Sequence, residues 1–317
     1  MTAGTRRRSF WAPGRVNLIG EFTDLVGGLV LPAALDLGIL LEAEPAAEIG
    51  LVSADADEGW TRYVDAVAAE LDALGRPPVG IAGRLTSTLP IGAGLSSSAA
   101  LEVVVALALC AVAEFSLEPL ELAQAARRAE RRAVGVPCGI LDQAASVLGK
   151  AGCAILLDTA TLAHEPVPLP PELALVILHS GVPRRLESSG YAERKRELEE
   201  GHPGRLRHVT SENDRVLATV DALRAGDLEP LGEIFREGQE SLRVDFEATI
   251  PELDRLVDLA YAGGAVAARM TGGGFGGAIV ALVEADGAEV FAGRVLAEYG
   301  PRGRAYICVA SDGAHEV

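Results

Sequence analysis

The segment PIGAGLSSSAALE, residues 90–102, constrains the fold more tightly than any other stretch of the chain. Residues 84–89 (RLTSTL) alternate like a strand before it, and a long apolar run with helical character follows it. Gly92 and Gly94 allow the backbone to turn sharply and to approach a ligand closely. The expected helix opens on three consecutive serines, Ser96, Ser97 and Ser98. Free N–H groups and the helix dipole favour an anion at such a helix start, so the segment predicts a phosphate-binding turn between a strand and a helix.

This glycine-rich turn does not match two familiar nucleotide motifs. It lacks the G-K-[ST] ending of the P-loop, and Ser97 occupies the third glycine position of G-x-G-x-x-G. A serine-capped helix without any ligand accounts equally well for a bare G-x-G-x-S-S pattern. Residues elsewhere in the chain must therefore decide between binding and a purely structural role.

Charge and hydropathy exclude several classes of protein. The net charge of −17 argues against a nucleic-acid partner, which would need a basic face. Nucleotides stay allowed, because backbone amides and a metal can hold phosphates on an acidic protein. No stretch has ~18 or more uncharged apolar residues, so no membrane span is expected. We interpret the basic residues Arg6 to Arg8 as a frayed start, and we expect no secretory signal because no apolar h-region follows them.

The cysteines and lysines narrow the chemistry further. The four cysteines form no C-x-x-C pair, which argues against zinc and redox motifs and favours reduced, buried thiols in a cytoplasmic protein. Only two lysines are present, Lys150 and Lys195, and neither follows a glycine-rich turn. A cation that acts on a phosphate is therefore expected to be an arginine or a metal.

Strand-like and helical patterns alternate in both halves of the chain. Strands are expected at residues 28–43, 49–53, 84–89, 154–158, 173–179, 278–283 and 305–309. Helices are expected at residues 61–74, 96–115, 119–135, 190–200, 211–224, 228–243, 251–263 and 285–299. A proline-rich stretch, residues 166–171, indicates a soft boundary. We therefore expect two α+β domains, residues 1–171 and 172–317, with the site between them.

Three separated segments carry a family pattern. They are GRVNLIGEFTDLVGG (14–28), PIGAGLSSSAALE (90–102) and RMTGGGFGGAIVAL (269–282). Three more fit the same pattern in the same order, namely AERRAVGVPCGILDQ (129–143), SSGYAERKRELEE (188–200) and SLRVDFEATIPELDRLV (241–257). Together they span nearly the whole chain and resemble the galactokinase branch of the GHMP small-molecule kinases. The resemblance implies a ribosomal-S5-like N-terminal domain, a ferredoxin-like C-terminal domain and ATP-dependent phosphorylation of a galactose-like sugar on its anomeric hydroxyl.

The resemblance also implies which residues bind ATP and Mg²⁺. The phosphate-binding set consists of small residues in the two glycine-rich turns: Gly92, Gly94, Ser96, Ser97, Ser98, Ala99, Gly273 and Gly274. The hydroxyl of Ser98 and the carboxylate of Glu130 are implied as metal ligands, and Mg²⁺ does favour hard oxygen ligands. Without the resemblance, Glu130 in RRAERR is better explained as a solvated charge.

Catalytic and sugar-binding roles follow from the same resemblance. Asp142, in GILDQ, is implied as the base that faces the anomeric hydroxyl, with Arg15 beside it. An arginine near a carboxylate favours its ionised form, and it places a positive charge near the transferred phosphoryl group. The implied sugar-binding residues are Glu21, Phe22, Asp24, Gly139 and Tyr191. From the residues alone, an aspartate after a glycine turn, such as Asp142, is more often a helix cap. Glu21 and Asp24 alone would be explained as two exposed loop carboxylates.

Two departures from the family pattern bear on the substrate. The signature normally reads Glu-His-Thr-Asp, and Phe22 stands in place of that histidine. The stretch of residues 200–208 is shorter than in typical galactokinases. Phe22 is expected either to present an apolar wall to the C5 substituent of the sugar or to turn into the core. The alternatives are a kinase for L-arabinose or a 6-deoxy galactose, and a catalytically silent sugar sensor, which the presence of Ser98, Glu130 and Asp142 disfavours.

Overall fold

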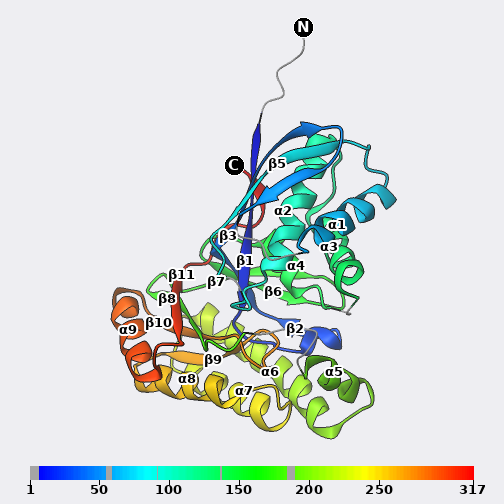
Figure 1. Cartoon of the computed structure of the whole chain (residues 1–317). Helices are drawn as coiled ribbons and strands as arrows, with labels where there is room; N and C mark the ends of the chain where they lie inside the picture. The colour runs from blue at the N-terminus through cyan, green and yellow to red at the C-terminus, as the bar shows by residue number, and fades with distance from the viewer. Residues whose placement is uncertain (1–6, 55–58, 91, 136–137, 184–189) are drawn as a thin grey trace.

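The computed structural model describes residues 7–54, 59–90, 92–135, 138–183 and 190–317 (Figure 1). Its described strands form sheets of five, four and three strands. The five-stranded sheet and the helices α1 to α4 make up one unit, and the four-stranded sheet lies with α7 to α9 in the other (Figure 1). The mixed α+β class expected from the sequence is confirmed.

The first unit is built on the five-stranded sheet, whose order is β12-β1-β3-β5-β4. Its strands are β1 (Arg8–Asn17), β3 (Pro32–Ala46), β4 (Gly50–Ser53), β5 (Gly80–Ser87) and β12 (His315–Glu316). The helices of this unit are α1 (Thr61–Ala73), α2 (Ser97–Val112), α3 (Pro119–Val134) and α4 (Leu141–Leu148). Val103, Val104 and Val105 of α2 are all fully buried, because α2 contacts the sheet on one side and α1 and α3 on the other. This position explains why the helix that follows the serine-rich turn is apolar all round.

A small antiparallel sheet joins β2 (Leu29–Val30), β6 (Cys153–Asp158) and β7 (His164–Pro168). The short β2 follows a one-turn 3-10 helix, η1 (Thr23–Leu25). The connection between β1 and β2 carries three of the expected sugar residues, Glu21, Phe22 and Asp24.

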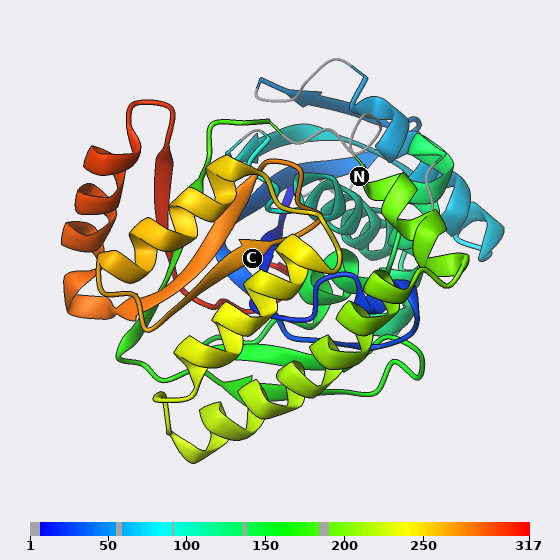
Figure 2. The ribbon, with the colours of Figure 1, turned by 90° about the horizontal axis from the view of Figure 1, so that it is seen from below.

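The second unit is an antiparallel sheet of order β11-β8-β10-β9. Its strands are β8 (Leu173–His179), β9 (Ala267–Thr271), β10 (Ala278–Glu284) and β11 (Arg304–Cys308). The helices are α5 (Tyr191–Glu199), α6 (Pro203–Ala225), α7 (Leu231–Val244), α8 (Pro251–Ala262) and α9 (Ala288–Tyr299), with the 3-10 turn η3 (Ala285–Gly287). Seen from below, α6, α7 and α8 cross the molecule as successive helices from yellow-green to gold (Figure 2). The buried face of β8 to β10 packs with α8 and α9 in a second hydrophobic core.

Several local expectations were wrong. The basic start is not frayed from Arg8 onward, because β1 begins there and Arg8 Nη2 lies 2.6 Å from Glu316 Oε2. Helix α6 begins at Pro203 rather than at residue 211, with proline in its first turn, where no amide is needed. The strand β9 and the helix α4 were not expected, since both are short and lie beside glycine-rich turns.

The expected division at residues 171 and 172 stays a proposal. It falls between β7 and β8, which belong to different sheets. However, β12 pairs with β1, and Ser311 N–H donates to Ala34 O at 2.9 Å. We therefore propose that the residues from Val309 onward belong to the first unit. No helix in the described part of the chain is long and apolar enough to cross a membrane.

Candidate active site

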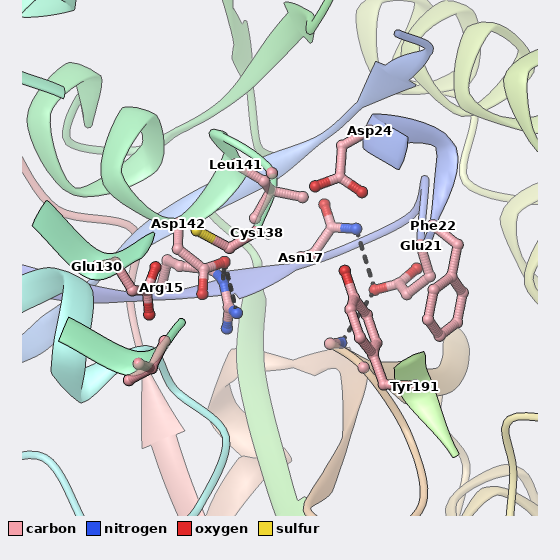
Figure 3. A pocket seen from close by; sticks show the side chains of 14 residues that line it. Arg15, Asn17, Glu21, Phe22, Asp24, Glu130, Cys138, Leu141, Asp142 and Tyr191 are labelled. Atoms are coloured by element: carbon pink, nitrogen blue, oxygen red, sulfur yellow. Dashed lines mark hydrogen bonds and ion pairs between the residues drawn. The ribbon is translucent and has the colours of Figure 1, made fainter. Parts of the chain in front are cut away.

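One pocket lies between the two units and holds most of the expected sugar and catalytic residues (Figure 3). Its polar wall comes from β1, the β1–β2 connection, α3 and α4. The polar residues are Arg15, Asn17, Glu21, Asp24, Glu130 and Asp142. Phe22, Val134, Cys138 and Leu141 add apolar surface, and Gly139 lies between them. The second unit contributes Tyr191, Gly272 and Gly273. The pocket therefore combines carboxylates, an arginine and an apolar wall, as a site for a polyhydroxylated ligand needs.

Arg15 and Asp142 form an ion pair at one end of this pocket. Arg15 Nε donates to Asp142 Oδ1 at 2.7 Å, and Arg15 Nη2 lies 2.6 Å from the same oxygen. Arg15 follows a register irregularity in β1, and its Nη1 donates to Gly94 O at 2.8 Å. Asp142 is in the first turn of α4. The arginine side chain is 4% exposed and the aspartate side chain 30% exposed, so the carboxylate faces the open part of the pocket.

The serine-rich turn meets the same carboxylate from the other side. Ser96 adopts a left-handed conformation with φ 58° and donates from Oγ to Asp142 Oδ2 at 2.6 Å. Gly92 and Gly94 have φ 70° and 76°, a region that glycine enters without strain. Ser97 begins α2, so the amides of Ser97, Ser98 and Ala99 have no carbonyl of their own helix to bond. The turn therefore presents amides without an intrahelical partner beside the Arg15–Asp142 pair.

His179 ties this turn to the second unit. Gly181 N–H donates to His179 Nδ1 at 3.0 Å, which leaves the other ring nitrogen as the protonated one. That nitrogen, Nε2, therefore donates to Gly92 O at 3.2 Å. Burial lowers the pKa of His179, which favours this neutral form.

Ser98 and Glu130 lie together behind the turn. Ser98 Oγ donates to Glu130 Oε1 at 3.0 Å, and Gln143 Nε2 donates to Glu130 Oε2 at 2.7 Å. Gln143 also donates to Glu102 Oε2 at 3.0 Å, and burial raises the pKa of Glu102 well above its usual range. A hydroxyl and a carboxylate oxygen fit Mg²⁺, which takes few protein ligands when phosphates supply the others. Among the described residues, no group of three or more acidic, histidine or cysteine side chains forms a metal cage.

Asp24 points into the pocket from η1 and rests against Gly139 (Figure 3). A Cβ on Gly139 would overlap the Asp24 carboxylate, so position 139 must lack a side chain. Burial, followed by the nearby charge of Asp142, raises the pKa of Asp24 to about 6. Arg127 and Arg15 oppose that rise.

Glu21 is the most buried carboxylate of the pocket, with an exposed fraction of 3%. Its Oε1 accepts from Asn17 Nδ2 at 3.0 Å and from Gly272 N–H at 3.2 Å. Burial raises the pKa of Glu21 to about 7, although Arg269 opposes the rise. Asn17 itself is fixed by Thr271, since Asn17 N–H donates to Thr271 Oγ1 at 3.1 Å and Thr271 Oγ1 donates to Asn17 O at 2.8 Å.

Phe22 both lines the pocket and belongs to the second core. Its ring stacks on Phe246 with a centroid distance of 4.0 Å and lies 5.8 Å from the ring of Tyr191. The residue is 4% exposed and has φ 67°, a left-handed conformation for a bulky residue. The two expectations for Phe22, an apolar wall and a core residue, thus both describe its surroundings.

The glycine-rich turn after β9, residues 272–277, contributes less to the pocket than the serine-rich turn region does to the Arg15–Asp142 pair. Gly273 lines the pocket, whereas Gly274 has φ 68° and packs against the backbone of Ala248. The structure thus gathers Arg15, Glu21, Asp24 and Asp142 at one pocket and leaves Gly274 in a packed turn. Three supporting residues, Asn17, Gln143 and His179, were not singled out from the sequence. Asn17 and Gln143 had a signal, because Asn17 lies two positions after Arg15 in GRVN and Gln143 follows Asp142 in GILDQ.

Comparisons with known proteins agree with this arrangement. Residues 62–150 match the GHMP kinases N terminal domain, residues 219–302 the GHMP kinases C terminal domain, and residues 3–45 the galactokinase galactose-binding signature. A galactokinase of Pyrococcus furiosus is 39% identical over 91% of this chain and 92% of its own length. A galactokinase of Chloroflexus aggregans is 39% identical over 95% of this chain and 91% of its own.

Solved structures give the same result. The structure of Lactococcus lactis galactokinase complexed with galactose superposes with a TM-score of 0.92 at 31% identity, covering 98% of this chain and 95% of that one. The structure of L. major mevalonate kinase in complex with R-mevalonate shares the fold alone, with a TM-score of 0.77 at 21% identity over 97% of this chain and 96% of that one. The expected two-domain GHMP kinase fold is thereby confirmed. The chain belongs to the galactokinase family of the GHMP kinases, and it is a sugar kinase of the class that phosphorylates an alcohol group.

Proposed function

We propose that this chain transfers the γ-phosphoryl group of ATP to the anomeric hydroxyl of galactose, giving galactose 1-phosphate and ADP. The observation that carries the proposal is the Arg15–Asp142 ion pair at the pocket that Glu21 and Asp24 also line. This pair lies beside the amides of the serine-rich turn that lack an intrahelical partner, so a sugar hydroxyl and a phosphate can meet there.

The proposed transfer uses Asp142 as the proton acceptor. The anomeric oxygen attacks the γ-phosphorus, the bond from that phosphorus to the bridging oxygen of ADP breaks, and the hydroxyl proton passes to Asp142. Arg15 orients the carboxylate through a contact of 2.6 Å and supplies positive charge near the transferred group. Ser96, which donates to the second oxygen of Asp142, holds the carboxylate in place from the opposite side.

For the sugar, we assign hydroxyl contacts to Glu21, Asp24 and Tyr191, with Phe22 as the apolar wall. Carboxylates that accept hydrogen bonds suit a ligand rich in hydroxyl donors. Gly139 allows Asp24 to reach the pocket, because any side chain at 139 would displace its carboxylate.

For the nucleotide, we assign the phosphates to the serine-rich turn and to Gly273 and Gly274. The residues of the turn are Gly92, Gly94, Ser96, Ser97, Ser98 and Ala99. Ser98 and Glu130 would hold Mg²⁺, which neutralises phosphate charge when bound. The support is the 3.0 Å contact between these two oxygens at the start of α2.

We also propose that the protein works in the cytoplasm on small molecules, with no nucleic-acid partner. Its four cysteines are free thiols in the structure, as a reducing compartment allows. Its net charge of −17 would repel a phosphate backbone.

One observation favours a second candidate substrate. Phe22 offers no hydrogen bond where the family signature has histidine, so L-arabinose or a 6-deoxy galactose is the alternative sugar. A silent sensor of the same fold is disfavoured, because Asp142, Arg15, Ser98 and Glu130 contact one another in pairs as a working site requires.

A coupled ADP-release assay across a sugar panel tests the proposal. Galactose, D-fucose, L-arabinose, glucose and mevalonate are offered with ATP and Mg²⁺, and Asp142→Asn serves as the inactive control. We expect the highest kcat/KM with galactose. Equal or higher kcat/KM with L-arabinose or D-fucose would favour the second candidate, and no ADP release with any sugar would refute both.

A further inference from the structure

The pocket carboxylate Glu21 is backed by an arginine that it shares with a second carboxylate. Arg269 Nη2 lies 3.1 Å from Glu21 Oε2 and 2.5 Å from Glu212 Oε1. The three side chains come from the β1–β2 connection, β9 and α6, and each is at most 1% exposed. Gly238 of α7 makes room for the guanidinium, because a Cβ there would overlap Arg269 Nη1. A buried charge of this kind is costly to leave unpaired, so the positions of the three groups depend on one another.

Helix α6 holds the backbone on which Glu21 stands. Gly20 N–H donates to Glu212 Oε1 at 2.9 Å, and the His208 ring bonds Glu21 O at 3.1 Å. Leu29 N–H donates to Asn213 Oδ1 at 2.7 Å. Positions 208 and 212 are one helical turn apart and share a face. Helix α6 therefore holds the β1–β2 connection near its start, at Gly20 and Glu21, and at its end, at Leu29. Arg269 then acts on the Glu21 side chain alone.

The two carboxylates share Arg269 unequally. Glu212 also accepts from Arg215 Nε at 2.9 Å, whereas Glu21 Oε2 makes no hydrogen bond within the described residues. At Glu21, burial raises the pKa to about 7 despite Arg269. At Glu212, burial also raises the pKa, but Arg269 and the other groups around this carboxylate, including Arg215 and the Gly20 N–H, together outweigh burial and lower the pKa to about 2. The charged groups that face Glu21 are therefore Arg269 from β9 and Glu212 from α6, with neutral His208 behind its backbone.

We propose that Arg269 is a positioning residue for Glu21, and that Glu212 sets how much of the arginine charge reaches Glu21. The proposal rests on the proposed sugar-binding role of Glu21. An ionised carboxylate only accepts hydrogen bonds, whereas a protonated one loses an acceptor site. The strength of the interaction between Arg269 and Glu21 therefore determines the pH below which Glu21 is protonated and the pocket binds sugar hydroxyls poorly.

The test is the pH dependence of kcat/KM for galactose, measured from about pH 5 to about pH 9, since this ratio reports groups of the free enzyme. The wild type should lose kcat/KM on the acid side, and Glu21→Gln should move the onset of that loss down to the range of Asp24, whose pKa is about 6. Glu212→Gln frees Arg269 for Glu21 and should move the limb down by about one pH unit. Arg269→Lys, whose single ammonium cannot bridge both carboxylates, should move it up by about one unit. Arg269→Lys should also raise KM for galactose about tenfold while KM for ATP stays within about twofold.

Matched variants separate positioning from general destabilisation. Arg243→Lys changes an exposed arginine of α7 that pairs with Glu240, and its profile should overlay the wild type. If Glu212→Gln fails to fold, Arg215→Gln replaces it, because Glu212 then depends more on Arg269 and the limb should move up. Acid limbs that coincide in all variants, with only a lower Tm, would overturn the proposal.

A binding measurement keeps this proposal distinct from the proposed function. Calorimetric titration with galactose yields the same pH profile without turnover. Galactose binding without ADP release would refute the proposed function alone. A binding profile that does not move in Arg269→Lys or Glu212→Gln would refute the positioning role alone.

Discussion

The Asp24 carboxylate lies directly against the backbone of Gly139, in space that any side chain at position 139 would occupy. Asp24 comes from η1 and Gly139 from the turn before α4, more than a hundred residues away. The contact therefore sets the distance between the sugar segment and the turn that carries Asp142.

Gly139→Ala should displace Asp24 from the pocket. A lost hydrogen bond to a sugar hydroxyl costs roughly 1–3 kcal/mol, so KM for galactose should rise about tenfold or more while KM for ATP changes little. Steady-state kinetics with each substrate varied measure this. Gly50→Ala is the matched control, since nothing lies near a Cβ at that exposed position of β4. Unchanged KM for galactose would show that Asp24 does not bind the sugar.

Asp142→Asn should keep nucleotide binding and nearly abolish transfer. The asparagine retains an oxygen for the Ser96 hydroxyl but cannot take up a proton, and general-base contributions are typically ~10²–10⁴-fold. Turnover and ADP binding are measured separately. Turnover within about threefold of wild type would remove Asp142 from the base role.

Ser98→Ala and Glu130→Ala should each raise the Mg²⁺ concentration needed for half-maximal turnover. Both variants remove one of the two oxygens that meet 3.0 Å apart at the start of α2. Titration of Mg²⁺ at saturating galactose measures the effect. Superimposable titration curves for both variants and the wild type would place the metal elsewhere.

His208→Gln should change the pH dependence of stability. Burial lowers the pKa of His208 to about 4, so the unfolded chain binds a proton first as pH falls below about 6.5. The histidine therefore costs stability between about pH 6.5 and 4, by up to roughly 3 kcal/mol. Glutamine can still donate to Glu21 O and does not titrate. Relative to wild type, the free energy of unfolding of His208→Gln should rise as pH falls through this window, and a constant difference would contradict the buried neutral histidine.

Phe22→His should shift preference toward galactose. Phenylalanine cannot hydrogen bond the 6-hydroxyl, so D-fucose and L-arabinose should compete unusually well in the wild type. An apolar pocket rejects an added hydroxyl only weakly, by about 10² at most. Ratios of kcat/KM for the three sugars in both proteins decide the matter. Constant ratios would mean that Phe22 acts only through its stacking on Phe246.

The glycine and serine motifs predicted the serine-rich turn and the helix after it, because turn chemistry is local. Helical and strand patterns predicted most element bounds for the same reason, for example β8 at Leu173–His179. The surroundings of Phe22 could not be predicted, since its partner Phe246 lies more than two hundred residues away and no short-range pattern links them. The burial of Glu130 was likewise missed by local pattern, because RRAERR reads as an exposed run until α2 and α4 cover one of its faces.

The pairing of β12 with β1 has a consequence for any fragment cut between β7 and β8. Phe10 pairs with Glu316 and Trp11 with His315. A fragment that ends near residue 171 lacks β12, so β1 would become an unpaired edge strand of the five-stranded sheet. Unpaired strand edges recruit strands from other chains. Such a fragment should self-associate, whereas a synthetic peptide spanning residues 309–317, supplied in trans, should restore a monodisperse particle.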